Sequence, residues 1–124
     1  MTEQQWHPGN LLQLSGSYWQ AFALHAGVKL DLFSLLAEGP QTASQAAARI
    51  GTQERSLATL LNALGAMGLV HKNGDRYAAA EGARRFLAKS SDAYIGHIIM
   101  HHHFLSTSWA RLDEAVLSGE SLRR

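Results

Sequence analysis

The chain has 124 residues, 46% of them hydrophobic and 17% charged, which is enough for one globular domain with its own core. A formal net charge of +1 gives no strong positive field for nucleic acid or anionic membranes, and the absence of cysteine excludes disulfides and thiolate chemistry. The first residues lack the basic start and apolar core of a signal peptide, so we expect a cytoplasmic protein.

The N-terminal part is predicted to be a loose arm over residues 1–9 and a helix over residues 10–28. This helix has no formal charge, but polar side chains interrupt it too often for a membrane span. Its apolar sector is wider than one ordinary stripe and needs cover on two sides. The chain could supply both covers itself, but a helix near a terminus favours a second copy, with Trp19 and Phe22 as anchors. The predicted homodimer interface consists of Leu11, Leu14, Tyr18, Trp19 and Phe22.

A winged helix-turn-helix is predicted over residues 42–87, after a second helix over residues 29–37. Thr42 to Gln45 reads as a capping box that opens a helix of small residues, and Thr52 is expected to cap the next helix, over residues 52–67. Asn73-Gly74 then predicts a hairpin wing with a type I′ turn, because both central residues of that turn need positive φ.

The helix over residues 52–67 has the position of a DNA-reading helix but not its side chains. It carries one arginine and one glutamate among mostly small or apolar residues, whereas groove reading needs cations and forked polar groups. We therefore expect no nucleic-acid binding. Basic residues around and after the wing keep a stand-alone DNA-binding transcription regulator open as the alternative; they are Lys72, Arg76, Arg84, Arg85 and Lys89.

The C-terminal part is predicted to be a short helix over residues 81–87 and a long helix over residues 92–118, which Gly119 ends. Apolar positions on the long helix repeat at a spacing near 3.5, which is typical of a seam between long helices. The seam residues are Ile95, Ile98, Ile99, His102, Leu105, Trp109, Leu112 and Val116. The whole chain is therefore predicted to be one mainly α domain, with an N-terminal dimerisation helix, a winged helix and a long C-terminal helix.

Histidines are the only candidates for site chemistry. His97 and His101 lie one helical turn apart, but two imidazoles without a nearby acid favour packing or hydrogen bonding over a metal site, so no metal is expected. Their polar and aromatic face also suits the wall of a small-molecule pocket. No glycine-rich nucleotide motif follows a strand, so we assign no catalytic and no cofactor-binding residue.

Several segments together resemble the N-terminal dimerisation region of small-molecule O-methyltransferases of the caffeic-acid and hydroxyindole type. Ser108 to Gly119 is similar to the family's Ser-Trp-x-x-Leu-x-x-Ala-Val-Leu-x-Gly segment. Arg76-Tyr77 with Arg85-Phe86-Leu87, and the segment from Val28 to Leu36, are similar to two further family motifs. The resemblance runs from about Leu11 to Gly119.

The resemblance implies a domain that pairs two subunits and lines the substrate pocket of an S-adenosylmethionine-dependent catalytic domain. No segment of the 124 residues matches the family's glycine-rich cofactor loop or its histidine base, so the Rossmann-like catalytic domain is expected to be absent here and the chain alone should not transfer methyl groups. The family's substrate-wall segment aligns with Ile99 to His102, which makes Met100, His101 and Phe104 position-based predictions for pocket lining.

Overall fold

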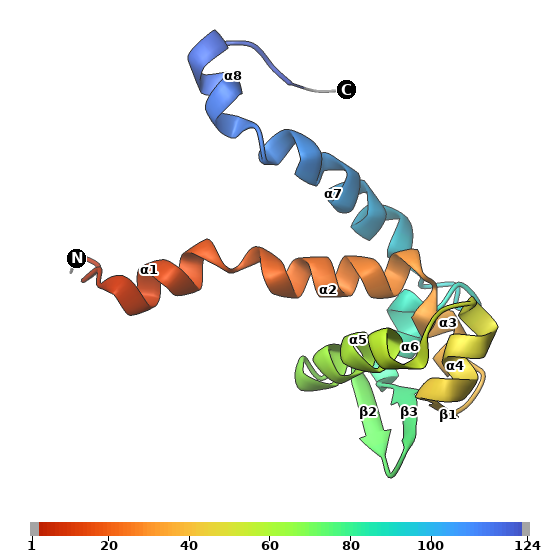
Figure 1. Ribbon diagram of the computed structural model, residues 1–124. Helices are drawn as coiled ribbons and strands as arrows, with labels where there is room; N and C mark the ends of the chain where they lie inside the picture. Colours follow the sequence, from red (N-terminus) through yellow and green to blue (C-terminus); the bar gives the residue numbers. More distant parts are fainter. Residues whose placement is uncertain (1–2, 123–124) are drawn as a thin grey trace.

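Two helical arms project from a winged-helix-like body in the computed structural model, which describes residues 3–122 (Figure 1). The N-terminal arm consists of α1 (Pro8–Ser15) and α2 (Tyr18–Lys29), and the C-terminal arm of α7 (Gly96–Trp109) and α8 (Leu112–Ser118). The arms contact each other where α2 meets α7, and they diverge from there toward the two ends of the chain.

The body lies between the arms in sequence and carries the only sheet among the described residues. Its elements are α3 (Leu32–Ala37), β1 (Gln41–Thr42), α4 (Ala43–Ile50), α5 (Glu54–Ala66), β2 (Val70–Asn73), β3 (Arg76–Ala79) and α6 (Glu81–Leu87). The antiparallel sheet has the order β1-β3-β2, with Gln41 opposite Tyr77 and Val70 opposite Ala79. The predicted fold class is confirmed, while the short strand β1 was not predicted.

The core of the body is centred on α3 and α5. Its largest fully buried side chains are Phe33, Leu32, Leu61, Leu64 and Val70. The leucines of α5 fall on one helical face, as their spacing predicts, and that face turns toward α2, α4 and β2. The apolar residues of α5, which has the position of a DNA-reading helix, therefore pack into the body.

Two local details of the body differ from the sequence prediction. Gln53, not Thr52, is the N-cap of α5. The hairpin turn is centred on Gly74-Asp75, because Asn73 still pairs with Arg76 in the sheet. Gly74 has a φ of 65° while Asp75 is not among the residues with positive φ, which is the φ pattern of a type II′ turn and not of type I′. The capping box between Thr42 and Gln45 is confirmed.

The predicted first helix is divided into α1 and α2. Gly16 and Ser17 separate them in a tight turn, where the Trp19 N–H donates to the Gly16 carbonyl over 3.1 Å, and such glycine and serine pairs are a common cause of helix kinks. The arm expected to be loose over residues 1–9 is corrected at its end, because α1 begins at Pro8, whereas residues 3–7 have no helix or strand. His7 caps it: its Nδ1 accepts from the Gly9 and Asn10 N–H groups, and Asn10 Oδ1 accepts from the His7 N–H. Residues 1–2 lie outside the described part.

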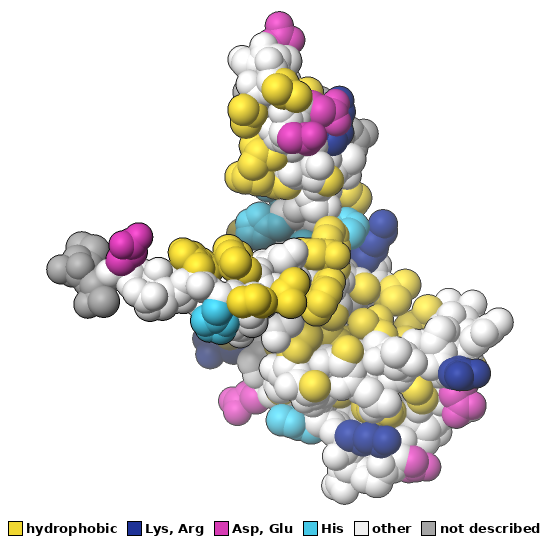
Figure 2. Space-filling model, turned by 60° about the vertical axis from the view of Figure 1, so that its left-hand side comes forward, with side chains coloured by type: hydrophobic (Ala, Val, Ile, Leu, Met, Phe, Trp, Pro, Cys, Tyr) yellow, Lys and Arg dark blue, Asp and Glu magenta, His cyan; other side chains and the backbone are white. Residues whose placement is uncertain are grey.

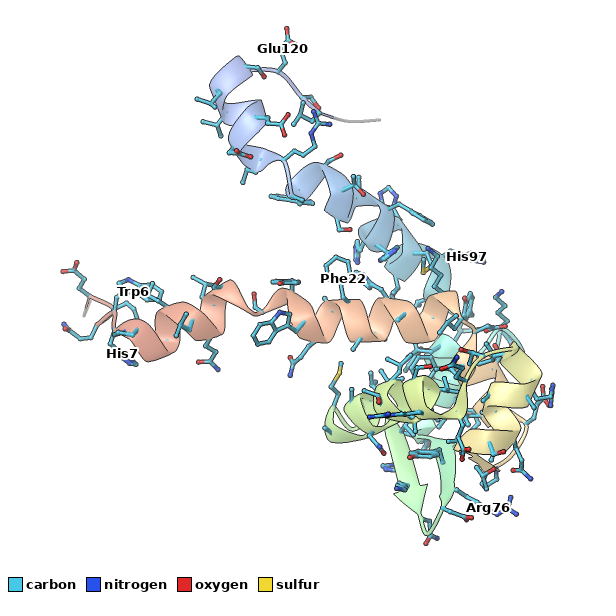
Figure 3. All side chains as sticks on the ribbon, in the orientation of Figure 1. Trp6, His7, Phe22, Arg76, His97 and Glu120 are labelled. Atoms are coloured by element: carbon cyan, nitrogen blue, oxygen red, sulfur yellow. The ribbon has the colours of Figure 1, made fainter. Side chains whose placement is uncertain are left out.

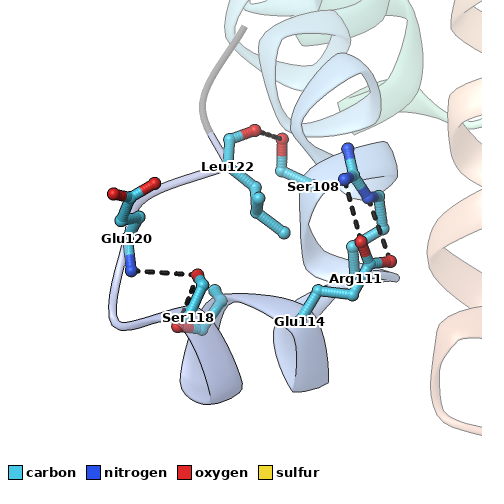
Figure 4. A network of polar contacts seen from close by, with 7 residues as sticks. Ser108, Arg111, Glu114, Ser118, Glu120 and Leu122 are labelled. Carbon is cyan, nitrogen blue, oxygen red and sulfur yellow. Dashed lines mark hydrogen bonds and ion pairs between the residues drawn. The ribbon is translucent and has the colours of Figure 1, made fainter.

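The long helix predicted over residues 92–118 is corrected in the same way. It begins at Gly96, because residues 88–95 form turns that carry the chain from α6 back toward α2. It is interrupted at Ala110 and Arg111, where neither glycine nor proline explains the break. Beyond it, Arg111 holds Glu114 in the first turn of α8, and Ser108 Oγ donates to the Leu122 carbonyl of the returning tail (Figure 4).

Gly27 sets the distance between the N-terminal arm and the body. A Cβ at this position would lie 2.8 Å from Phe33 Cε2 and 3.2 Å from Leu64 Cδ1, so only glycine lets α2 approach the core this closely. The last turns of α2 belong to the core through Val28, whereas its first turns and α1 extend away from it.

Candidate functional site

The N-terminal arm presents a row of large apolar side chains to solvent. All five predicted interface residues are exposed in the single chain, from Phe22 at 38% to Trp19 at 67%. Leu12, at 70%, belongs to the same surface and was not among the predicted interface residues. Apolar side chains gather along this arm (Figure 2), and exposed apolar patches are typical of interaction surfaces.

The C-terminal arm carries a second exposed apolar surface. The predicted seam residues do not form a seam within the chain, since only Ile99 is buried and Ile98, Trp109 and Val116 are largely exposed. Leu117 is 86% exposed, the highest value among the large hydrophobic residues that the structure describes. The described residues supply no second helix along most of this surface, so the predicted packing seam stays a prediction for contacts with another chain.

The junction of the two arms is built from aromatic rings and histidines. His25 on α2 and His103 on α7 face each other with 3.2 Å between their Nδ1 atoms. Phe22 points from α2 toward α7 and contacts both imidazoles edge to face, with centroid distances of 5.5 Å to His25 and 5.7 Å to His103 (Figure 3). Sequence analysis placed His102 in the seam and missed this pair, because a shift of one residue on a helix turns the side chain by about 100°.

His25 is the buried histidine of this junction, with 8% of its surface exposed. Burial lowers the pKa of His25 below its usual value, and the nearby His103 and His102 lower it further. The neutral imidazole is therefore favoured. One ring can then donate its Nδ1 hydrogen while the other accepts it.

The three residues predicted to line a pocket lie on α7 in different environments. Met100 is half-buried and packs against the body core. His101 is exposed, and Phe104 is 53% exposed with the Lys29 ammonium 5.8 Å from its ring centroid. Met100 and Phe104 are one turn apart, so they share a side of the helix.

The remaining histidines of α7 do not assemble a metal centre. His97 is exposed and stacks edge-on against Tyr94, and within residues 3–122 no three histidine, aspartate or glutamate side chains gather into a group that could hold a metal ion. In the same residues, no helix is both long and apolar enough to cross a membrane.

The surface that would face DNA is sparsely charged and partly committed to internal contacts. Asn62 on the exposed side of α5 accepts from the Tyr77 hydroxyl over 2.8 Å, and Lys72 lies over the Tyr77 ring. Arg76 donates to the Pro40 carbonyl, and Lys89 pairs with Asp31. Of the basic residues around and after the wing, Lys72, Arg76 and Lys89 thus contact groups of the body itself.

Comparison with known proteins identifies the domain. The O-methyltransferase dimerisation domain family matches residues 12–89, and the chain belongs to this family. It is 38% identical to the N,N-dimethyltransferase OxyT of Streptomyces rimosus over 90% of this chain and 33% of OxyT. It is 36% identical to the tetracenomycin polyketide synthesis 8-O-methyl transferase TcmO of Streptomyces glaucescens over 91% of this chain and 34% of TcmO.

A solved structure agrees with these sequence relatives. The structure of PigF with SAH superposes with a TM-score of 0.84 at 30% identity, over 92% of this chain and 34% of PigF. The chain thus spans about a third of the length of the relatives it matches. What this chain shares with these methyltransferases is about one domain's length, and it includes the O-methyltransferase dimerisation domain.

Proposed function

We propose that this chain pairs two copies of an S-adenosylmethionine-dependent methyltransferase and contributes one wall of the pocket for its small-molecule acceptor. The observation that carries the proposal is the exposed apolar surface of both arms in a domain of the dimerisation family. Burial of apolar area stabilises association by roughly 25 cal/mol per Å², so side chains such as Trp19 and Leu14 gain most when a second copy covers them.

Of the two predicted anchors, Trp19 allows the clearer test of pairing by substitution. Its ring contacts Tyr18 and covers Gly16, all within the N-terminal arm, so most of it remains available to a partner. Phe22 also contacts His25 and His103 of its own chain, and replacing it would disturb the arm junction as well as a dimer interface. A test of pairing should therefore rest on Trp19.

Sedimentation velocity over a range of protein concentrations tests the homodimer. We expect the wild-type chain to sediment as a dimer. In the Trp19→Ser variant the Kd of the dimer should rise at least about tenfold, as for loss of a central aromatic residue of an interface. Phe86→Ser is the matched control, because Phe86 is an aromatic residue on the body with 39% exposure. A monomeric wild type, or a Trp19 variant that pairs as tightly as the control, would contradict the proposed interface.

The pocket wall is proposed for Met100, His101 and Phe104. Two observations support it: Phe104 and His101 are exposed on one arm, and PigF, similar over this region, was solved with SAH, the product that S-adenosylmethionine leaves after methyl transfer. The names of the relatives include both an N- and an O-methyltransferase, so the proposal covers a small-molecule acceptor without fixing its accepting atom.

This part of the proposal is tested in a protein that joins these residues to their catalytic domain. The coding sequence around these 124 codons should encode a strand followed by a Glu/Asp-x-Gly-x-Gly-x-Gly loop. In that protein, Phe104→Ala should raise KM for the acceptor more than KM for S-adenosylmethionine, while Phe86→Ala should change neither. Equal effects on both substrates would argue against a pocket-lining role for Phe104.

The same protein also serves to test the alternative function, DNA binding. We expect no shift of a duplex DNA fragment in a gel at physiological salt, because phosphate contacts alone give only weak, salt-sensitive affinity. Tight binding with a steep loss of affinity as salt rises would favour a transcription regulator instead.

A further inference from the structure

The two arms are joined through a small number of side chains at their crossing. Around the facing Nδ1 atoms of His25 and His103, Phe22 covers the pair, and Phe104 stacks edge-on against His103 at 5.5 Å. Beyond this crossing α1 and α8 diverge, so a small change at the junction moves the arm ends by a larger distance (Figure 1). The junction therefore has the position of a hinge.

We propose that the His25–His103 contact is an acid-sensitive latch that fixes the angle between the arms. With both imidazoles neutral, one Nδ1 donates and the other accepts, and the arms stay together. One added proton still leaves one donor and one acceptor. When both rings are protonated, two N–H groups and two positive charges face each other across 3.2 Å, and the contact breaks.

Among residues 3–122, the charges near the junction would not hold two protonated rings together. The other titratable groups near the junction are His102 and Lys29, which are also basic, while the remaining histidines of α7 are exposed. Asp31, the acid that follows α2, accepts from Ser34 and pairs with Lys89. Helix α3 has no titratable side chain, and those of α5, Glu54 and Arg55, lie in its exposed first turn.

The pH window follows from the neutral preference of His25. Burial and the neighbouring histidines lower the pKa of His25, so the closed junction favours the unprotonated ring. The neutral His25 ring contributes fully to the stability of the closed junction above the ordinary histidine pKa of about 6.5. This contribution is lost as the pH falls below that pKa. A metal ion bridging the two Nδ1 atoms would be the other use of such a pair, but the described residues provide no third ligand.

A distance measurement between the arms tests the latch directly. The chain has no cysteine, so Gln13→Cys on α1 and Thr107→Cys on α7, both at exposed positions, can carry two spin labels. Diluting labelled with unlabelled chain restricts the pulsed-EPR signal to one molecule, whether or not copies pair. Between about pH 7.5 and about pH 5 we expect the distance distribution to move to longer values, with circular dichroism showing that the helices remain.

Two further variants decide the outcome. His103→Asn keeps a group that donates and accepts near the Nδ1 position but cannot be charged, so its arms should keep one distance at both pH values. His101→Asn, on the exposed side of α7, should open as the wild type does. An unchanged wild-type distance, or an opening in His103→Asn equal to that of the wild type, overturns the proposal and leaves the sedimentation result unaffected.

Discussion

The body and the arms carry the same kinds of apolar residue, but the body buries them and the arms expose them. In the body, leucines such as Leu61 and Leu64 are fully buried by other segments of the same chain. In the arms, Leu12 and Leu117 have comparable helical settings and remain 70% and 86% exposed. A periodic apolar pattern therefore predicts a surface for packing, but it does not indicate whether the same chain or another molecule covers it.

The difference also separates what holds the domain together from what the domain is for. The winged-helix-like body forms one core, which Val28 of α2 and Ile99 of α7 complete, and leaves few large apolar side chains outside it, with Phe86 as one example. We propose that the exposed apolar surfaces of the arms are where two copies pair. Stability should accordingly depend on the body, and association on the arms.

The most direct test of this difference between body and arms is the same substitution made in each region. Leu61→Ala removes a fully buried side chain and should lower the free energy of unfolding by about 2–5 kcal/mol, because a cavity adds to the lost transfer energy. Leu117→Ala, at an exposed position, should change it by no more than about 0.5 kcal/mol. Urea denaturation at one protein concentration, low enough for sedimentation to show monomers, measures both without a contribution from pairing. Equal losses would show that the arm is part of the folding core.

A smaller effect is expected where the N-terminal arm joins the body. Gly27→Ala adds a methyl group against Phe33 and Leu64, neither of which can move within the core, so the overpacking cost of about 1–3 kcal/mol should exceed the gain in helix propensity. Gly82→Ala in α6 is the control, because a Cβ there meets nothing within 4 Å and should stabilise slightly. Thermal unfolding compares the two; a stabilised Gly27 variant would mean that α2 docks more loosely than its contacts imply.

The body could be predicted from the sequence in more detail than the arms. The Thr42 capping box, the inward face of α5 and the existence of the hairpin follow from local rules, since each depends on residues within a few positions. Strand β1 could not be found this way, because it is defined by the pairing of its two residues with Tyr77 and Arg76 far along the chain. The wrong turn type has the same origin, as the sheet register keeps Asn73 in the strand.

In the arms, the five residues predicted to form the interface are exposed, but the geometry of the arms was not predicted. The kink at Gly16 and Ser17 had a local signal that a helix prediction over residues 10–28 passed over, whereas the break at Ala110 had none. The contact between His25 and His103 joins residues 78 positions apart, and no helical periodicity could pair them. Only the crossing of α2 and α7 reveals it.

The smallest of these effects concerns the two capping boxes, one in each region. Thr42→Ala removes the acceptor of the Gln45 N–H at the start of α4 and should cost about 1 kcal/mol of unfolding free energy, since α4 packs on the core through Ala46 and Ala47. His7→Ala removes the equivalent acceptor from α1, which has no buried residue, so it should fray that helix and leave the unfolding midpoint of the body unchanged. Hydrogen exchange resolves the two by location. Loss of protection in α5 on removing the His7 cap would mean that arm and body unfold as one unit, and the division between them would then be one of shape alone.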